Sequence, residues 1–481
     1  MKLVWRRMSA YTLFLISFFF LKAGALDLEV LDKTSLATLV EQADGVTIES
    51  SVARANQARK DWNFLVYFAA NNNLYRFAIE NIKQMAKIGS TSNVNVIIQL
   101  DELGAKNMTR YYVQKNALTN IHKESNTAAS ISGTRESLYE FLTWTIAHYP
   151  ANHHCLVLWN HGSGIKDPSM WGKFFLTHRD ELFSLNEDTG LYELNRKLSR
   201  QYAAAQDAKS LVLEYDRGIS FNDTFETYLT NQDLQIVLDQ VCRESLHGKK
   251  IDIICMDACL MAMAEVAAQV EGASDYLVAS QEVEPGSGYD YSIVLAPFAN
   301  TTLTPEAFSK FIVQAYGLQY YSKCADYTQS AISIAYMSEL EKNFATVVAY
   351  LTKAMNSSQK DLCIKLLKNI RLNSKKTLEF DDPDYIDMGI FYASLYELIA
   401  QDKLFAKFGN SPVAFKDTVK AGLGIIAAMV CANVAGSNVN RATGVSFFFP
   451  TRAIHASYKK TIFDQKTKWS TLLALFLKNV K

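Results

Sequence analysis

The sequence predicts an α/β fold in which a largely parallel central sheet is covered by helices on both faces. Three observations support this class: short, continuously apolar runs, helical patterns between them, and enough apolar residues for a large core. Hydrophobic residues make up 49% of the 481 residues and charged residues 20%, which excludes a disordered chain. Basic and acidic residues are equal at 49 each, so no nucleic-acid-binding surface is indicated.

The apolar runs and the helical patterns alternate over residues 61–300. Strands are expected at 63–69, 94–101, 155–160, 251–256 and 275–281, and helices at 74–89, 135–150, from 230 onward and at 260–270. Gly89 and Pro150 close the first two helices, and Thr230 is a suitable N-cap for the third. Residues 165–220 show little periodicity and many basic residues, which is typical of a functional loop.

A second section begins near residue 301. Helices are expected near 305–320 and 338–355, and strands at 331–337 and 444–450. We therefore expect residues 301–481 to form a C-terminal α+β subdomain.

Residues 1–25 have the pattern of an export signal. Lys2, Arg6 and Arg7 precede the apolar run Tyr11–Leu21, and Ala23, Gly24 and Ala25 offer small residues for cleavage. This apolar run is too short to cross a hydrocarbon core, which needs about 20 residues. We expect a mature chain that begins near Leu26, a polar leader over 26–60, and a periplasmic or extracellular protein without a membrane span.

The seven cysteines are sparse and odd in number, which argues against a disulfide framework. Cys255 and Cys259 are four residues apart, but they lack the C-x-x-C spacing and the second ligand pair that structural zinc sites prefer. No metal site is expected there. Cys255 lies inside an apolar run, where burial raises the pKa of a thiol and lowers its reactivity, whereas Cys259 follows that run.

Cys259 and His161 are the candidate catalytic pair. Each follows an apolar run, and if the two strands are neighbours in a parallel sheet, both side chains emerge at its carboxyl edge. A thiol is mostly un-ionised at neutral pH and needs such a base. Gly162 has no Cβ, so its backbone N–H could join that of Cys259 in an oxyanion site. The alternative is two core strands that end in capping polar residues.

Several carboxylates are candidates for binding a substrate. Asp257 lies two residues before Cys259 and would point to the same side of an extended strand, where it could pair with a cationic side chain. The alternative for Asp257 is an N-cap of the helix expected from Leu260. Glu282 is a second candidate, with Glu284 and Asp290 nearby around the same turn.

The blocks WNHGSG (159–164) and MDACLM (256–261) resemble the clostripain family of cysteine peptidases, in the caspase-like clan. Further similar blocks follow in the same order over roughly residues 60–450. They are VYFAANNNL (66–74), VNVIIQLD (94–101), TRYYV (109–113), RGISFNDT (217–224), YLTNQDL (228–234), SQEVEPGSGYDY (280–291), DYIDMG (384–389) and GVSFFFP (444–450).

The resemblance implies a caspase-like three-layer α/β/α sandwich over 61–300, with Cys259 as nucleophile, His161 as general acid/base and Gly162 in the oxyanion site. It implies an endopeptidase that cleaves proteins or peptides after Arg or Lys, requires no cofactor for the chemistry, and belongs to a family in which some members are associated with calcium. It also implies self-cleavage between Lys166 and Arg217, which would leave a monomer of two associated fragments.

Two other functions remain open from the sequence. The chain could be a catalytically silent, caspase-like binding protein that keeps the sandwich as a scaffold. It could also be a related cysteine hydrolase or transpeptidase that prefers a different P1 residue.

Overall fold

The computed structural model of the chain describes most residues from 58 onward. The described residues are 58–123, 131–166, 183–186, 189, 191–194, 218–222, 224–401 and 412–479. The expected signal peptide, nearly all of the leader and most of the 165–220 segment lie outside the described residues.

A nine-stranded sheet forms the centre of the molecule, in the order β14-β12-β11-β10-β5-β1-β2-β3-β4. Its parallel core consists of β1 (Lys60–Ala69), β2 (Val94–Asp101), β5 (Ala151–Trp159), β10 (Ile251–Asp257) and β11 (Ser274–Ala279). Antiparallel strands extend both ends, namely β3 (Thr109–Gln114), β4 (Ala117–Lys123), β12 (Thr328–Ser333) and β14 (Val430–Ala435). The predicted fold class is confirmed.

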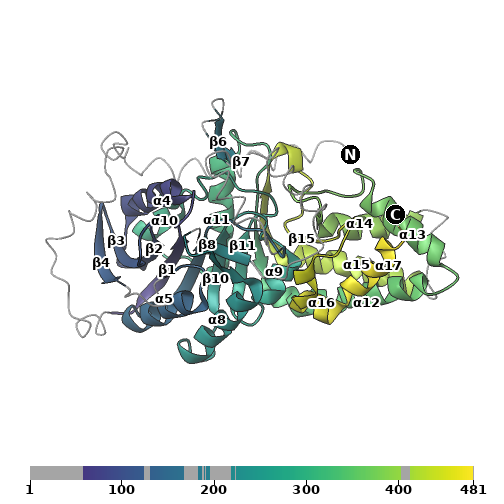
Figure 1. Ribbon diagram of the computed structural model, residues 1–481, viewed down its shortest axis with the longest axis horizontal. Helices are drawn as coiled ribbons and strands as arrows, with labels where there is room; N and C mark the ends of the chain where they lie inside the picture. Colours follow the sequence, from purple (N-terminus) through teal and green to yellow (C-terminus); the bar gives the residue numbers. More distant parts are fainter. Residues whose placement is uncertain are drawn as a thin grey trace, which may run out of the picture.

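Helices cover both faces of this sheet and give three layers (Figure 1). One face carries α4 (Tyr75–Ile88), α10 (Tyr291–Leu295) and α11 (Pro305–Tyr320), and the other carries α5 (Arg135–His148), α8 (Asn231–Glu244) and α9 (Ala264–Gln269). Side chains of β1 alternate between the two cores: Phe64 and Val66 pack on the α4 side, and Leu65 and Tyr67 on the α5 side. A strand buried on both faces is mostly apolar, which explains the long apolar runs.

Local signals in the sequence set the ends of several helices. Thr230 caps α8 in a capping box with Asp233, as predicted from the sequence. The helix expected from Leu260 begins instead at Ala264, because Leu260 has a positive φ of 65° and Met263 is extended. The N–H of Leu260 donates to the carbonyl of Glu282, and that of Ala262 donates to the carbonyl of Ser280. These hydrogen bonds hold the non-helical segment against residues 280–282.

The C-terminal section both extends the sheet and adds a helical layer of its own. Strands β12 and β14 belong to the nine-stranded sheet, so the sheet continues across the boundary expected at residue 300. The remaining elements gather at one end of the molecule in Figure 1. They are α12 (Met337–Met355), α13 (Lys360–Arg371), β13 (Tyr385–Asp387), α14 (Met388–Gln401), α15 (Pro412–Met429), β15 (Ser446–Phe448), α16 (Ile462–Thr467) and α17 (Trp469–Leu477).

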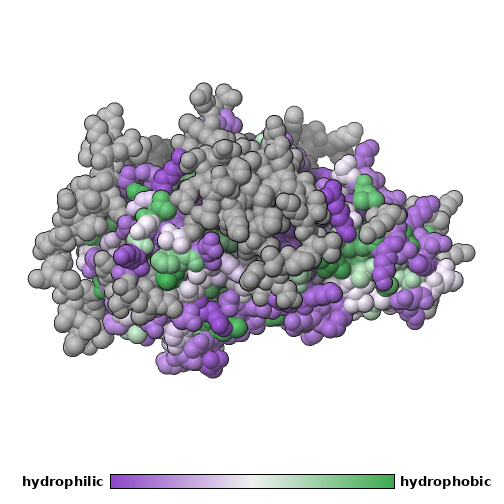
Figure 2. All heavy atoms as spheres, in the orientation of Figure 1, coloured by the Kyte–Doolittle hydropathy of each residue, from purple (hydrophilic) through white to green (hydrophobic). Residues whose placement is uncertain are grey.

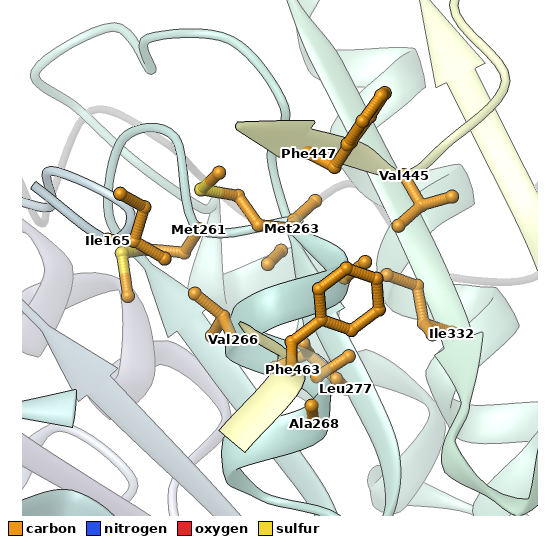
Figure 3. Close-up of a cluster of buried hydrophobic side chains, with 14 of the residues drawn as sticks. Ile165, Met261, Met263, Val266, Ala268, Leu277, Ile332, Val445, Phe447 and Phe463 are labelled. Carbon is orange, nitrogen blue, oxygen red and sulfur yellow. The ribbon is translucent and has the colours of Figure 1, made fainter. Parts of the chain in front are cut away.

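Apolar packing joins the chain after Cys259 to the C-terminal section. Figure 3 shows Met263 toward Phe447 and Met261 beside Ile165, in one cluster that also contains Val445. Backbone pairing accompanies this packing, because the N–H of Ser446 donates to the carbonyl of Ala262 over 2.8 Å. The C-terminal section thus supports the segment that follows the candidate nucleophile.

A buried carboxyl at this junction predicts a pH-dependent stability. Glu265 is 1% exposed, and its Oε1 accepts the N–H of Phe448 over 3.0 Å. Burial raises the pKa of Glu265 to about 7. The folded state then holds a proton that the unfolded state loses at lower pH, so this carboxyl makes folding less favourable as the pH rises from about 4.5 to 7.

The variant Glu265→Gln removes this titration and keeps an acceptor for Phe448. We expect it to be about 2–3 kcal/mol more stable than wild type at pH 8, with the difference shrinking toward zero near pH 4.5. Urea unfolding at the two pH values measures the effect. Glu339→Gln, at an exposed position on α12, is the control. An equal difference in stability at both pH values would contradict the raised pKa.

The described surface shown in Figure 2 is mainly hydrophilic, with small hydrophobic areas between the polar side chains. Within the ranges that the structure describes, no helix combines the length and the apolar character needed to cross a bilayer.

Candidate active site

The pairing of β5 with β10 brings His161 and Cys259 to the same edge of the sheet. Trp159 and Asp257, the last residues of these parallel strands, are register partners. His161 and Cys259 each lie two residues beyond that pair. The N–H of Asn160 also donates to the carbonyl of Asp257 over 3.3 Å. Residues separated by about a hundred positions in the chain therefore meet at one rim of the molecule.

Gly162 packs directly on the backbone of the cysteine block. A Cβ built at this position would overlap the carbonyl oxygen of Cys259 and would lie 2.9 Å from Cγ of Met261. A side chain here would force one backbone or the other to move. Glycine is therefore required by the close approach of these two segments.

The thiol of Cys259 is partly buried and lies among carboxylates. Its Sγ accepts the N–H of Glu284 over 3.3 Å. Burial, with smaller contributions from the nearby carboxyl groups of Glu284 and Asp381, raises the pKa of the Cys259 thiol to about 12. The rival thiol of Cys255 is fully buried, with its Sγ 3.8 Å from that of Cys155, and has the position of a packing residue.

The imidazole of His161 is only 7% exposed, and its Nε2 lies 2.8 Å from Oδ1 of Asn73. Burial lowers the pKa of His161 to about 3. Both members of the candidate pair are therefore neutral at physiological pH in this form. Because burial is the main cause of both shifts, greater contact with solvent would move both pKa values back toward their ordinary range.

The strand that follows the predicted activation loop is bound to the histidine block. This strand, β8 (Gly218–Asn222), pairs with β9 (Thr227–Thr230), and its Ile219 forms an isolated bridge with Gly162. The N–H of Phe221 donates to Oδ1 of Asn160 over 3.0 Å, and Nδ2 of Asn160 donates back to the carbonyl of Phe221 over 3.1 Å. The segment that follows the expected cleavage range therefore lies beside the block that contains His161.

Lys166, the first basic residue of the expected cleavage range, is held by the C-terminal section. Its Nζ bonds to Asp382 over 2.8 Å and to Asp384 over 2.6 Å, and its N–H donates to the hydroxyl of Tyr385. The range also contains the antiparallel strands β6 (Phe183–Asn186) and β7 (Leu191–Leu194). The other basic residues considered for cleavage lie outside the described residues: Lys173, Arg179, Arg196, Lys197, Arg200, Lys209 and Arg217.

Asp257 forms a buried carboxyl pair with Glu284. Its Oδ2 accepts the hydroxyl of Tyr291 over 2.6 Å and the N–H of Tyr289 over 3.3 Å. Burial raises the pKa of Asp257 to about 6, and burial together with the neighbouring Asp257 raises the pKa of Glu284 well above its usual range. Two carboxyls buried in one site resist ionising together, so the pair favours a form that keeps a proton. Asp257 does not cap α9, whose N-cap position is Met263.

The remaining acidic candidates have different surroundings. Glu282 is buried, and its Oε1 accepts the N–H groups of Val283 and Asp381. Asp290 caps α10 by accepting the N–H groups of Ser292 and Ile293, which is a structural role.

Sequence reasoning missed two residues beside the candidate pair. Asp381 lies close enough to raise the pKa of Cys259, and Asn73 contacts His161. Asn73 belongs to the block VYFAANNNL (66–74), and Asp381 lies three residues before the block DYIDMG (384–389).

Calcium is implied only by the family resemblance. Across the residues that the structure describes, no group of three or more His, Cys, Asp or Glu side chains is arranged to hold a metal ion.

Comparison with known proteins gives a family and a set of solved structures. The sequence model of the clostripain family matches residues 66–175 and 203–474. A secreted C11 cysteine protease from Bacteroides thetaiotaomicron, in complex with an irreversible peptide inhibitor, is 17% identical with a TM-score of 0.54, over 85% of this chain and 99% of that chain. An inactive zymogen C11 protease from Parabacteroides distasonis gives the same values.

A further structure of a secreted C11 cysteine protease from Bacteroides thetaiotaomicron, iotapain, is 13% identical with a TM-score of 0.53, over 85% of this chain and all of that chain. No curated protein sequence matches. At these identities the structural likenesses establish the fold alone.

Proposed function

The chain belongs to the clostripain family and is a cysteine peptidase, and from this premise we propose an exported endopeptidase that cleaves after Arg or Lys. In the proposal Cys259 is the nucleophile and His161 the general acid/base. The observation that carries these roles is the register of β5 and β10, which sets the two residues at one edge of the sheet.

The proposed reaction follows from this geometry. The sulfur of Cys259 attacks the scissile carbonyl carbon while the imidazole of His161 accepts the thiol proton. The N–H groups of Gly162 and Cys259 donate to the oxyanion of the tetrahedral intermediate. When the C–N bond breaks, the imidazolium returns its proton to the leaving amine. Water, deprotonated by His161, then hydrolyses the thioester.

The described form has the properties of a chain before activation. Its thiol and imidazole are both neutral because both are buried, so an opening of the site would favour catalysis. We propose that self-cleavage between Lys166 and Arg217 supplies that opening. Hydrogen bonds from Phe221 to Asn160, together with the pairing of β5 and β10, would keep the two fragments associated. A similar fold occurs in the inactive zymogen from Parabacteroides distasonis.

Export is proposed from the pattern of residues 2–25 and from the similarity to a secreted protease. The destination is the periplasm or the medium.

The preference for a basic P1 residue is proposed from the carboxylates around Cys259. Glu284, Asp381 and Glu282 each raise the pKa of the thiol, so acidic side chains surround the nucleophile. A guanidinium that reaches Asp257 would favour the ionised form of this carboxyl, whose pKa is raised to about 6. Binding of Arg is then coupled to proton release, so affinity for a cationic P1 residue should rise with pH through about 6.

Asp257→Asn is expected to weaken recognition of P1 Arg. We expect kcat/KM for an Arg peptide to fall about 10–100-fold, which corresponds to the loss of hydrogen bonds to a charged group. The same peptide with P1 citrulline, a neutral isostere, should be affected much less. Reporter peptides that differ only at P1 measure both effects, with Asp61→Asn at the opposite end of the sheet as control. Cleavage after Asn or Asp but not after Arg would refute the proposed specificity.

A further inference from the structure

Asn73 contacts the imidazole of His161 from the segment between β1 and α4, with its Oδ1 2.8 Å from Nε2. We propose that Asn73 is a positioning residue of the peptidase: its amide oxygen accepts the Nε2–H of His161 and so presents Nδ1 as the basic nitrogen. The inference rests on the proposed role of His161 as general acid/base.

The chemistry of the two groups fixes the tautomer. An amide oxygen only accepts hydrogen bonds, and a neutral imidazole carries a single N–H. If Nε2 donates to Asn73, the lone pair lies on Nδ1, and only that nitrogen can take the proton of Cys259. Because the amide is uncharged, it orients the ring without stabilising the imidazolium as strongly as a carboxylate would.

The residues that precede Asn73 and His161 donate hydrogen bonds to the same two backbone carbonyl groups. Nδ2 of Asn72 donates to the carbonyls of Ala69 and Phe221, each over 2.9 Å. Nδ2 of Asn160 donates to these same carbonyls, over 3.1 Å in the case of Phe221. The residues that precede Asn73 and His161 are thus fixed against one another. Oδ1 of Asn72 also accepts the N–H of Leu74, which fixes the chain on the other side of Asn73.

The pairing of the sheet and these hydrogen bonds together hold Asn73 in contact with His161. The preceding strands β1 and β5 are parallel neighbours, with Phe68 opposite Trp159 in the register. The pairing of β1 with β5 therefore fixes the distance between the segments that follow these strands. The side-chain amides of Asn72 and Asn160 fix how far each segment extends beyond the edge of the sheet. Rotation of the His161 ring would break its bond to Asn73, so the ring has one preferred orientation.

The test compares Asn73→Ala, Asn73→Asp and His161→Ala by kcat/KM against pH on a P1 Arg peptide. Variants that do not process themselves are first cut by immobilised wild-type enzyme, which is then removed. Urea unfolding checks that each variant is folded. Asn152→Ala, at an exposed position near the start of β5, is the matched control and should behave as wild type.

We expect Asn73→Ala to lower kcat/KM about 10–100-fold, because part of the general-base contribution depends on the ring orientation. Asn73→Asp can only accept, so it should keep activity within about 10-fold of wild type. Its carboxylate favours the imidazolium. The limb of the pH–rate profile that reports ionisation of the imidazole should therefore move to higher pH, by about 1 pH unit or more. A merely structural hydrogen bond would leave that limb in place.

The outcomes separate this inference from the proposed function. Full activity in His161→Ala would refute the proposed function itself. An inactive His161→Ala with wild-type activity and an unchanged pH profile in both Asn73 variants would overturn only the role of Asn73. Should Asn73→Ala fail to fold, the pH profile of Asn73→Asp decides: an unmoved limb overturns the proposal.

Discussion

Cys259→Ala is expected to abolish peptide hydrolysis and to leave the chain uncut. Loss of the nucleophile from a set of catalytic residues that act together lowers kcat by about 10⁴–10⁶-fold, because the remaining groups cannot form the covalent intermediate. The measurements are kcat/KM on a P1 Arg peptide and N-terminal sequencing of the purified chain after incubation. Wild type should acquire a new N-terminus between positions 166 and 217.

Cys431→Ala is the matched control, since Cys431 is also partly buried but lies on the edge strand β14. It should process itself and react with a labelled arginine chloromethyl ketone as wild type does, whereas Cys259→Ala should not react. Identical processing of the Cys259→Ala chain in isolation would rule out self-cleavage. Residual hydrolysis near the wild-type rate would rule out Cys259 as nucleophile.

Gly162→Ala is expected to lower kcat/KM by about 10²–10³-fold. The added methyl group would overlap the carbonyl oxygen of Cys259, so the backbones of the histidine and cysteine blocks must separate. The N–H groups of Gly162 and Cys259 are the proposed oxyanion donors, and such donors act only when both point at the developing charge. Turnover of an Arg peptide measures the loss.

Alkylation of Cys259 by neutral iodoacetamide forms no oxyanion and should slow much less in this variant. Gly424→Ala is the control: nothing lies within 4 Å of a Cβ there, and the position is inside α15. It should leave turnover unchanged and stabilise the helix by about 0.5–1 kcal/mol. Wild-type turnover in Gly162→Ala would contradict the oxyanion role.

The parallel core of the sheet was predictable because its strands are buried on both faces. A strand such as β10 must then be mostly apolar and must end where polar residues begin, which marks the carboxyl edge at Asp257. The order of the strands carries no such local signal. That β10 lies beside β5 depends on contacts between residues about a hundred positions apart, and the sequence indicated it only through family resemblance.

Residues that act through distant partners were the hardest to predict. Asn73 reads as one of three asparagines in a turn, and only the pairing of β1 with β5 shows that it meets His161. Asp381 comes from the C-terminal section, and its approach to Cys259 needs the packing of that section on the loop after the nucleophile. The late start of α9 likewise depends on the non-helical backbone of Leu260 and Met263, in a segment that hydrogen bonds to Glu282 and Ser280 hold in place.

The carbonyl of Phe221 receives the side-chain amides of both Asn72 and Asn160. Phe221 follows the expected cut, whereas the two asparagines precede it. If the chain is cut there, the fragment that contains Cys259 still accepts hydrogen bonds from the fragment that contains His161. A nicked molecule would remain one cooperative unit that melts in a single transition, and neither piece could be washed away from the other without denaturant.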